Sequence, residues 1–255
     1  MIELLLVGIG SGNPDHLTGE AVAALHSADV VLIPRKGTDK RALADLRRRL
    51  CAGILSNRQT KVVEFDLPRR DIDNPAYLDG VAHWHSAITD AWARLIGQHA
   101  PQGGRVALMV WGDPALYDSS LRIADRLRAH GIPLTCRVVP GISSLQMLAA
   151  AFAIPLNTVG APFLVTTGRR LRTDGWPAGV DTVIVMLDGT CAFQSLDPEG
   201  ITIYWAAYLG MPCEIRRSGL LAEVGVEIVA ERETARRTHG WIMDTYLLRR
   251  ATPAR

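Results

Sequence analysis

The first 150 residues alternate between short apolar runs and longer segments whose apolar positions have helical spacing. The apolar runs lack the in-and-out alternation of half-exposed strands, so they indicate strands buried on both faces of a parallel sheet. The helical segments supply the crossovers that parallel strands need. Strands are predicted at 2–7, 28–33, 61–65, 106–110 and in a run ending at 139, and helices at 18–27, 40–50, 75–98, 119–130 and from 143 onward.

The rest of the chain has more strands and fewer helices. This balance favours a mixed sheet with an antiparallel edge, because antiparallel strands need no helical crossover. The fold class is therefore α/β, with an N-terminal α/β domain over 1–150 and a C-terminal α/β domain over 151–255. Strands of the second domain are predicted at 162–167, 182–187, 201–207, 215–221, 227–230 and 242–248.

A glycine-rich loop, GIGSGNPD at 8–15, follows the first strand. Its spacing differs from the G-x-G-x-x-G fingerprint of dinucleotide sites, and Pro14 lacks the N–H that a phosphate would use. The loop is better explained as a tight turn in which Asn13, Asp15 or Thr18 caps the next helix.

Two further turns end neighbouring strands between 105 and 148. One contains Gly112-Asp113-Pro114 and the other Pro140-Gly141, followed by Ser143 and Ser144. Each alone could be an ordinary turn. Together, at the carboxyl ends of parallel strands, they predict two walls of one ligand pocket. Asp113 is suited to a ribose hydroxyl or a cationic amine, and the serines to a carboxylate or ribose.

Composition argues against several classes of partner and site. A net charge of +2 without a dense basic patch argues against a nucleic-acid partner. The four cysteines lie far apart with no CxxC, so we expect reduced thiols without disulfides or zinc. No apolar run reaches the ~18 residues of a membrane helix, and we expect a soluble cytoplasmic protein.

Some charged and imidazole side chains have two interpretations. Arg35 and Lys36 end a strand, where they could bind an anion or form a solvated turn. His83 and His85 are two residues apart on a predicted helix and so face different sides, which argues against a metal site built from this pair. The basic helix at 40–50, with Arg47, Arg48 and Arg49, is expected at the surface.

Three motifs carry a family resemblance. VGIGSGNPDHLT, WGDPALY and VVPGISSLQMLAA, in this order, resemble the tetrapyrrole methyltransferases over nearly the whole chain. The resemblance implies two α/β domains with S-adenosylmethionine (SAM) bound in the cleft between them, no metal, and a homodimer. Relatives often have Pro where Ser11 stands. Many also have Asp where Pro34 stands, and Pro34, unlike Asp, cannot act as a base.

Further stretches, among them ADVVLIPRKG and VVEFDLPRRD, resemble the deacetylating member of the family. That member transfers a methyl group from SAM to ring carbon 1 of precorrin-5, and water removes acetate. Two alternatives stay open: another precorrin C-methyltransferase without deacetylation, and a non-catalytic SAM-binding protein. By motif, the implied cofactor contacts are Trp111, Gly112, Asp113, Leu116, Ser143 and Ser144, with Met186, Leu187, Leu209 and Gly210 from the second domain.

The chemistry suggests the remaining residues. Methyl transfer needs donor and acceptor aligned at about 3–3.5 Å in a dry site, which suits Trp111, Leu116, Met186 and Leu187. Deacetylation needs a base for water, and the candidates are Tyr117, Asp118, Asp66 and His85. Cations suit the many carboxylates of the substrate, and the candidates are Arg35, Lys36, Arg69, Arg70 and His83.

Overall fold

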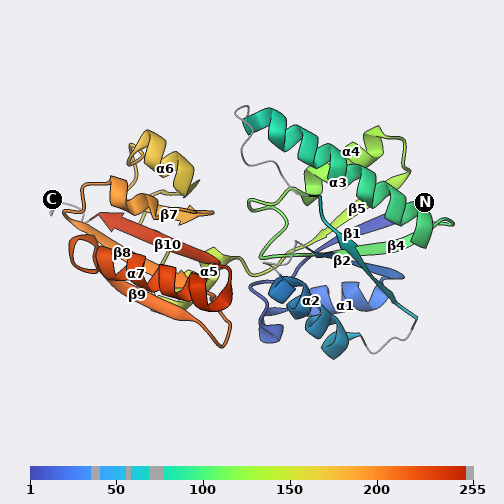
Figure 1. Cartoon of the computed structure of the whole chain (residues 1–255), viewed down its shortest axis with the longest axis horizontal. Helices are drawn as coiled ribbons and strands as arrows, with labels where there is room; N and C mark the ends of the chain where they lie inside the picture. Colours follow the sequence, from blue (N-terminus) through green and yellow to red (C-terminus); the bar gives the residue numbers. More distant parts are fainter. Residues whose placement is uncertain (36–40, 56–58, 69–76, 251–255) are drawn as a thin grey trace. The chain divides into compact units, whose positions relative to one another are not determined.

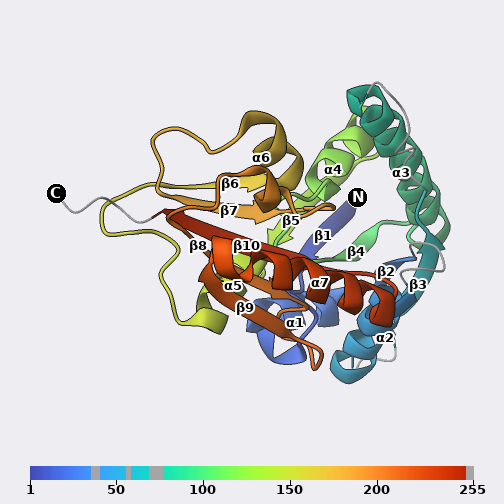
Figure 2. The same ribbon diagram turned by 60° about the vertical axis from the view of Figure 1, so that its left-hand side comes forward.

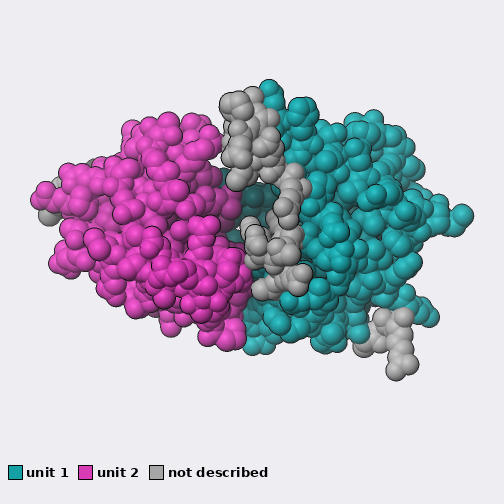
Figure 3. Space-filling model, in the orientation of Figure 1, with its two compact units in different colours: residues 1–143 teal, residues 144–255 magenta. Residues whose placement is uncertain are grey.

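The computed structural model describes residues 1–35, 41–55, 59–68 and 77–250 (Figure 1). The chain divides into two compact units, Met1–Ser143 and Ser144–Arg255, coloured separately in Figure 3. The division falls at the start of α5 (Ser144–Phe152), whereas the sequence suggested 150/151. Because α5 packs against β8 (Ile201–Ala207) and β10 (Asp244–Arg250), it belongs with the second sheet.

Unit 1 is built on a five-stranded parallel sheet in the order β3-β2-β4-β1-β5. The parallel α/β prediction is confirmed, with helices crossing between successive strands (Figure 1). The strands are β1 (Ile2–Gly8), β2 (Val30–Arg35), β3 (Lys61–Asp66), β4 (Gly104–Val110) and β5 (Leu134–Val139). The helices are α1 (Gly19–Ser27), α2 (Arg41–Ile54), α3 (Tyr77–His99) and α4 (Ser120–Ala129), with a short 3-10 helix η1 (Pro14–His16) before α1.

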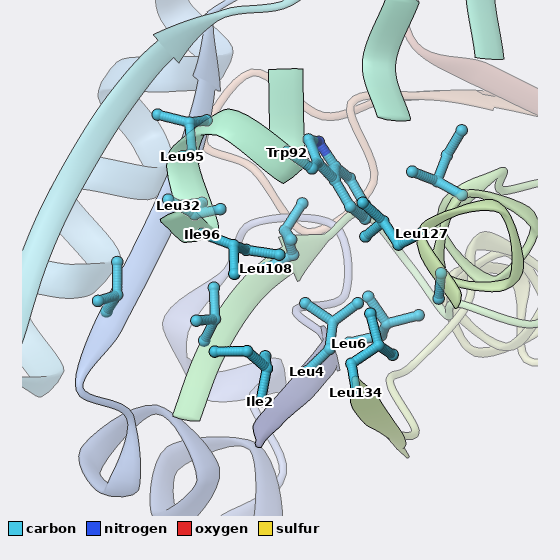
Figure 4. Packing of buried hydrophobic residues seen from close by; sticks show 14 of the residues in the cluster. Ile2, Leu4, Leu6, Leu32, Trp92, Leu95, Ile96, Leu108, Leu127 and Leu134 are labelled. Atoms are coloured by element: carbon cyan, nitrogen blue, oxygen red, sulfur yellow. The ribbon is translucent and has the colours of Figure 1, made fainter. Parts of the chain in front are cut away.

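The central strand β1 is buried on both faces, as its unbroken apolar run predicts. Leu4 and Leu6 pack in one cluster with Trp92 of α3 and Leu127 of α4 (Figure 4). Leu5 and Val7 pack in the cluster on the opposite face, which α1 and α2 cover. Successive strand residues point to opposite faces, so β1 contributes side chains to both clusters. Burying each Leu or Val side chain stabilises the fold by roughly 1.5–3 kcal/mol.

Side-chain caps shape the loop between β1 and α1. The Asp15 N–H donates to Asn13 Oδ1 at 3.0 Å, and the Ala21 N–H donates to Thr18 Oγ1 at 3.0 Å. Two of the three predicted capping residues therefore satisfy free N–H groups at helix starts. The caps confirm a structural turn here.

Unit 2 contains a mixed five-stranded sheet in the order β6-β7-β10-β8-β9. β6 pairs parallel with β7, and the other pairs are antiparallel, so the predicted mixed sheet is confirmed. Phe152 of α5 contacts Tyr204 on one face, whereas α6 and α7 contribute to the core cluster on the other (Figure 2). The new elements are β6 (Phe163–Thr167), α6 (Gly168–Asp174), β7 (Thr182–Met186), η3 (Ala192–Ser195), β9 (Ile215–Leu220) and α7 (Leu221–His239).

One predicted strand is wrong. Residues 227–230 lie inside α7, which begins directly after β9. Leu221, Ile228 and Ala235 are buried at seven-residue intervals, a helical stripe that a four-residue apolar run conceals. The short run resembled a strand because periodicity separates helix from strand poorly over so few residues.

The longest helix is amphipathic. α3 has 23 residues and carries Asp79, Asp90 and Arg94 along its length. Within the described part of the chain, no helix is long and apolar enough to cross a membrane.

Candidate active site

Three glycines bring three loops of unit 1 together at the carboxyl ends of β1, β4 and β5. A Cβ atom on Gly8 would lie 2.6 Å from the Gly141 nitrogen and 2.9 Å from the Gly112 oxygen. A Cβ on Gly141 would collide with the Gly112 oxygen and lie 2.8 Å from Gly8 Cα. Only glycine fits at 8 and 141, so these loops form one rigid edge of the sheet.

The β1 and β4 loops are also joined directly. The Gly112 N–H donates to the Gly10 oxygen at 2.8 Å, and the Gly10 N–H donates to the Gly112 oxygen at 3.3 Å. Both residues have left-handed backbones, with φ of 65° at Gly10 and 62° at Gly112. The glycine motif therefore serves close backbone packing.

Asp113 holds the β4 and β5 loops together. Its Oδ2 accepts from the Gly141 N–H at 2.9 Å, and its Oδ1 accepts from the Ala115 N–H at 2.8 Å. The sequence suggested a ligand contact for this carboxylate, whereas both oxygens already bind main-chain donors. Asp113 is thus a positioning residue, and each oxygen keeps a further lone pair for a ligand.

The other implied cofactor residues of this edge are half-buried or buried around the same loops. Leu116 ends the turn that Asp113 caps, and its N–H donates to the Asp113 oxygen at 3.2 Å. Ser143 is 7% exposed. Ser144, at the start of α5, has a buried hydroxyl that bonds to no described residue. A buried unpaired hydroxyl is uncommon and fits a residue that awaits a polar ligand.

Three of the four candidate bases lie close to one another. Tyr117, with φ of 51°, and Asp118 precede α4, where Asp118 Oδ1 accepts from the Ser120 N–H at 2.6 Å. His85 of α3 is 6% exposed, and its Nε2 lies 2.9 Å from Ser119 Oγ. Burial raises the pKa of Tyr117, so its phenol stays protonated at neutral pH.

Asp66 lies elsewhere. It ends β3 with an 82% exposed side chain and pairs with Arg35 of β2. Arg35 Nε and Nη2 each lie 3.0 Å from a carboxylate oxygen of Asp66, which makes a bidentate pair. Arg35 and Asp66, assigned from sequence to substrate binding and to catalysis, therefore bind each other.

The remaining predicted substrate residues give a mixed result. His83 is exposed on α3 while His85 is buried, which confirms that the two imidazoles face different sides of the helix. Lys36, Arg69 and Arg70 lie outside the described residues. Among the residues that the structure does describe, no group of three or more His, Cys, Asp or Glu side chains could hold a metal ion.

In unit 2, the implied cofactor residues share one edge of the sheet. β10 is antiparallel to both β7 and β8, so the carboxyl ends of β7 and β8 point the same way. Met186 ends β7 and Leu187 follows it, 66% exposed with φ of 52°. Leu209, after β8, is instead 5% exposed, and the Gly210 N–H donates to Glu214 Oε2 at 2.6 Å. An exposed leucine in a left-handed backbone is strained, which fits a surface reserved for a ligand.

A buried polar network supports this edge. Asp188, directly after Leu187, accepts from the Tyr246 hydroxyl at 2.7 Å, and burial raises the pKa of that tyrosine. Arg232 of α7 donates to Asp244 Oδ2 at 2.8 Å and to the main-chain oxygen of Asp188 at 2.7 Å. Each buried charge is thereby paired, which offsets the free energy of removing it from water.

Comparison with known proteins identifies the family. Residues 3–225 match the family model of the Tetrapyrrole (Corrin/Porphyrin) Methylases. The chain belongs to this family. The resemblance inferred from the three motifs is thus confirmed, and the chain is a methyltransferase.

Individual relatives agree with this placement. The methylase is 45% identical over 251 residues to a Sinorhizobium protein named precorrin-6A synthase [deacetylating], covering 98% of this chain and 96% of the relative. A crystal structure of a putative cobalamin synthesis related protein (CobF) from Corynebacterium diphtheriae superposes with a TM-score of 0.83 at 32% identity, covering 99% of this chain and all (100%) of that one. A uroporphyrin-III-C-methyltransferase structure from Thermus thermophilus has a TM-score of 0.60 at 24% identity, covering 97% and 92%, and shares the fold.

Sequence reasoning missed one buried charge of the methylase. Arg47 was expected at the surface, but it is 6% exposed and its guanidinium lies 5.0 Å from the Trp111 ring centroid. Leu43, Leu50 and Cys51 share its side of α2 at helical spacing, so its position in that apolar stripe could have revealed it. The paired network around Asp188 had no comparable local signal.

We predict that Gly141→Ala destabilises the methylase. The added Cβ meets backbone atoms of Gly8 and Gly112, which have no rotamer to change, so we expect a loss of about 1–3 kcal/mol in the free energy of unfolding. Gly97→Ala, in α3 with no atom within 4 Å of the added Cβ, is the matched control. It should gain up to about 1 kcal/mol. Urea unfolding measures both, and equal stability of the two variants would contradict the close-packing argument.

We also predict a pH-dependent contribution from His85. Burial, then the charges of Arg126 and Arg122, lower the pKa of His85 from 6.5. The unfolded chain therefore binds this proton first, and stability should fall as the pH drops below about 6.5. His85→Gln should make the fall in unfolding free energy between about pH 7 and pH 5 shallower, while His83→Gln on the exposed side should not. Parallel pH profiles for wild type and His85→Gln would be inconsistent with a buried neutral imidazole.

Proposed function

We propose that this methylase is a precorrin-6A synthase of the deacetylating type. It transfers a methyl group from SAM to ring carbon 1 of precorrin-5, and water removes the neighbouring acetyl group as acetate in cobalamin biosynthesis. The observation that carries the proposal is the 45% identity to the Sinorhizobium enzyme across nearly the full length of both chains. The proposal includes a cytoplasmic homodimer, as the family resemblance implies.

The site residues are suited to SAM. When bound, SAM supplies an electrophilic methyl group and leaves as S-adenosylhomocysteine. The unpaired hydroxyl of Ser144 offers a polar contact. Trp111, Leu116, Met186 and Leu187 would exclude water from the reacting atoms, which favours transfer between aligned groups. We infer that SAM contacts these residues.

Among the four candidate bases, Asp118 is the most suitable acceptor of the water proton. Asp66 is exposed and paired with Arg35, and protonated Tyr117 cannot accept a proton. His85 is buried against Ser119, so we assign it to positioning the 117–119 segment. Asp118 is half-buried, and only its Oδ1 has a hydrogen-bond donor among the described residues. A carboxylate with a free oxygen can act as a general base.

The deciding assay measures acetate and S-adenosylhomocysteine together, under anaerobic conditions, with precorrin-5 generated in situ. The proposal expects one acetate for each S-adenosylhomocysteine. Methyl transfer without acetate would move the enzyme to another ring position. Tight S-adenosylhomocysteine binding with neither product would favour a different substrate or a non-catalytic SAM-binding role.

Asp118→Asn should separate the two half-reactions. The asparagine oxygen can still cap α4, so the fold should remain, but the amide cannot take a proton. We expect acetate release to slow about 100-fold, the range that general bases contribute, with methyl transfer less affected. Unchanged acetate release in a folded variant would remove Asp118 from this role.

A further inference from the structure

Arg47 is a buried cation that forms no ion pair with any residue in the described part of the chain. Its Nε donates to the Met109 oxygen at 3.1 Å and its Nη1 to the Leu43 oxygen at 3.4 Å. Its Nη2 donates to no residue in the described ranges, and no described carboxylate forms an ion pair with it. Burial lowers the pKa of Arg47 to about 10, partly opposed by the charge of Asp118, so the side chain remains charged at neutral pH.

An unpaired buried charge is unfavourable for folding alone. Carbonyl hydrogen bonds and the Trp111 ring offset part of the desolvation, but a carboxylate would offset far more. Arg232 in unit 2 illustrates the usual arrangement, since Asp244 pairs with it at 2.8 Å. The missing partner at Arg47 therefore points to an anion that is not part of the described chain.

Two more unpaired donors belong to the loops that pack around α2 and Trp111. A Cβ on Gly12 would lie 2.9 Å from two Trp111 ring carbons and collide with Leu46, so the β1 loop rests directly on Trp111 and α2. Ser11, the neighbour of Gly12, has a buried hydroxyl with no partner among the described residues, and the buried Trp111 indole N–H likewise has none. A hydroxyl, an indole N–H and a guanidinium together are suited to a carboxylate.

We propose that Arg47, Ser11 and Trp111 form a buried subsite for a carboxylate of a bound ligand. The inference rests on the proposed function, which provides two sources of that group: the acidic side chains of the tetrapyrrole and the amino-acid end of SAM. The subsite is distinct from Arg35, whose guanidinium binds Asp66.

The Ser11→Ala variant distinguishes ligand binding by the Ser11 hydroxyl from a purely structural role. An unpaired buried hydroxyl destabilises a fold, so Ser11→Ala should raise the melting temperature. If the hydroxyl binds a carboxylate, the same substitution should also weaken ligand binding. A lower melting temperature for Ser11→Ala would mean that the hydroxyl is satisfied within the protein, and it would overturn the subsite without reference to activity.

The main test compares Arg47→Met, Arg47→Lys and Ser11→Ala with wild type. Arg49→Met is the matched control, because Arg49 is exposed on the same helix and its loss changes the net charge equally. The measurements are KM for precorrin-5, calorimetric affinity for S-adenosylhomocysteine, and affinity for methylthioadenosine, which lacks the carboxylate. Circular dichroism establishes folding, and Arg47→Lys and Ser11→Ala carry the test if Arg47→Met does not fold.

If the subsite binds a tetrapyrrole carboxylate, Arg47→Met should raise the KM for precorrin-5 at least tenfold and leave the affinity for S-adenosylhomocysteine unchanged. If the subsite binds the SAM carboxylate, Arg47→Met should lose tenfold in affinity for S-adenosylhomocysteine and lose no affinity for methylthioadenosine. Folded variants within twofold of wild type in every measurement would overturn the subsite. Failure of the proposed function itself would differ, because wild type would then not release acetate and S-adenosylhomocysteine one-for-one from precorrin-5.

Discussion

The closely packed backbones of Gly8, Gly112 and Gly141 determine where the functional part of unit 1 can form. Parallel strands direct their carboxyl ends to one edge, but loops with ordinary side chains could not approach within van der Waals contact there. The three glycines allow that approach, and Asp113 maintains it through its bond to the Gly141 N–H. Leu116 and Ser144, which follow these turns, take their positions from this packing.

The position of Asp113 changes how the family motif is understood. A carboxylate in a Gly-Asp-Pro turn suggests direct ligand recognition, yet here it accepts from Gly141 and Ala115. Its contribution to binding is then the placement of main-chain groups, whose rigidity lowers the entropy lost when a ligand binds. His85 has a similar relation to the 117–119 segment through Ser119. Both side chains thus hold neighbouring segments in place.

The buried arginines of the two units have different partners. In unit 2, Arg232 donates to the Asp244 carboxylate and to the main-chain oxygen of Asp188, and this network holds the segment after β7, where Leu187 is exposed in a strained backbone. In unit 1, the guanidinium of Arg47 donates to two carbonyl oxygens and lies over the Trp111 ring, and no carboxylate of the described residues forms an ion pair with it. A fully paired network contributes rigidity, whereas a partly paired one retains binding capacity. The contrast is the basis for assigning structure to the first and ligand recognition to the second.

The sequence by itself determined the alternating α/β pattern, the mixed second sheet, the capped β1–α1 turn and the family, because each depends on local spacing or on short motifs. It failed at 227–230, where four residues are too few to distinguish the helical period of α7 from a strand. Three contacts became visible only in the folded protein: Arg35 binds Asp66, His85 binds Ser119, and the buried Arg47 donates to the Met109 oxygen. These contacts join residues that are 31 to 62 positions apart, and the packing of whole helices and strands brings such residues together, so no local pattern records them.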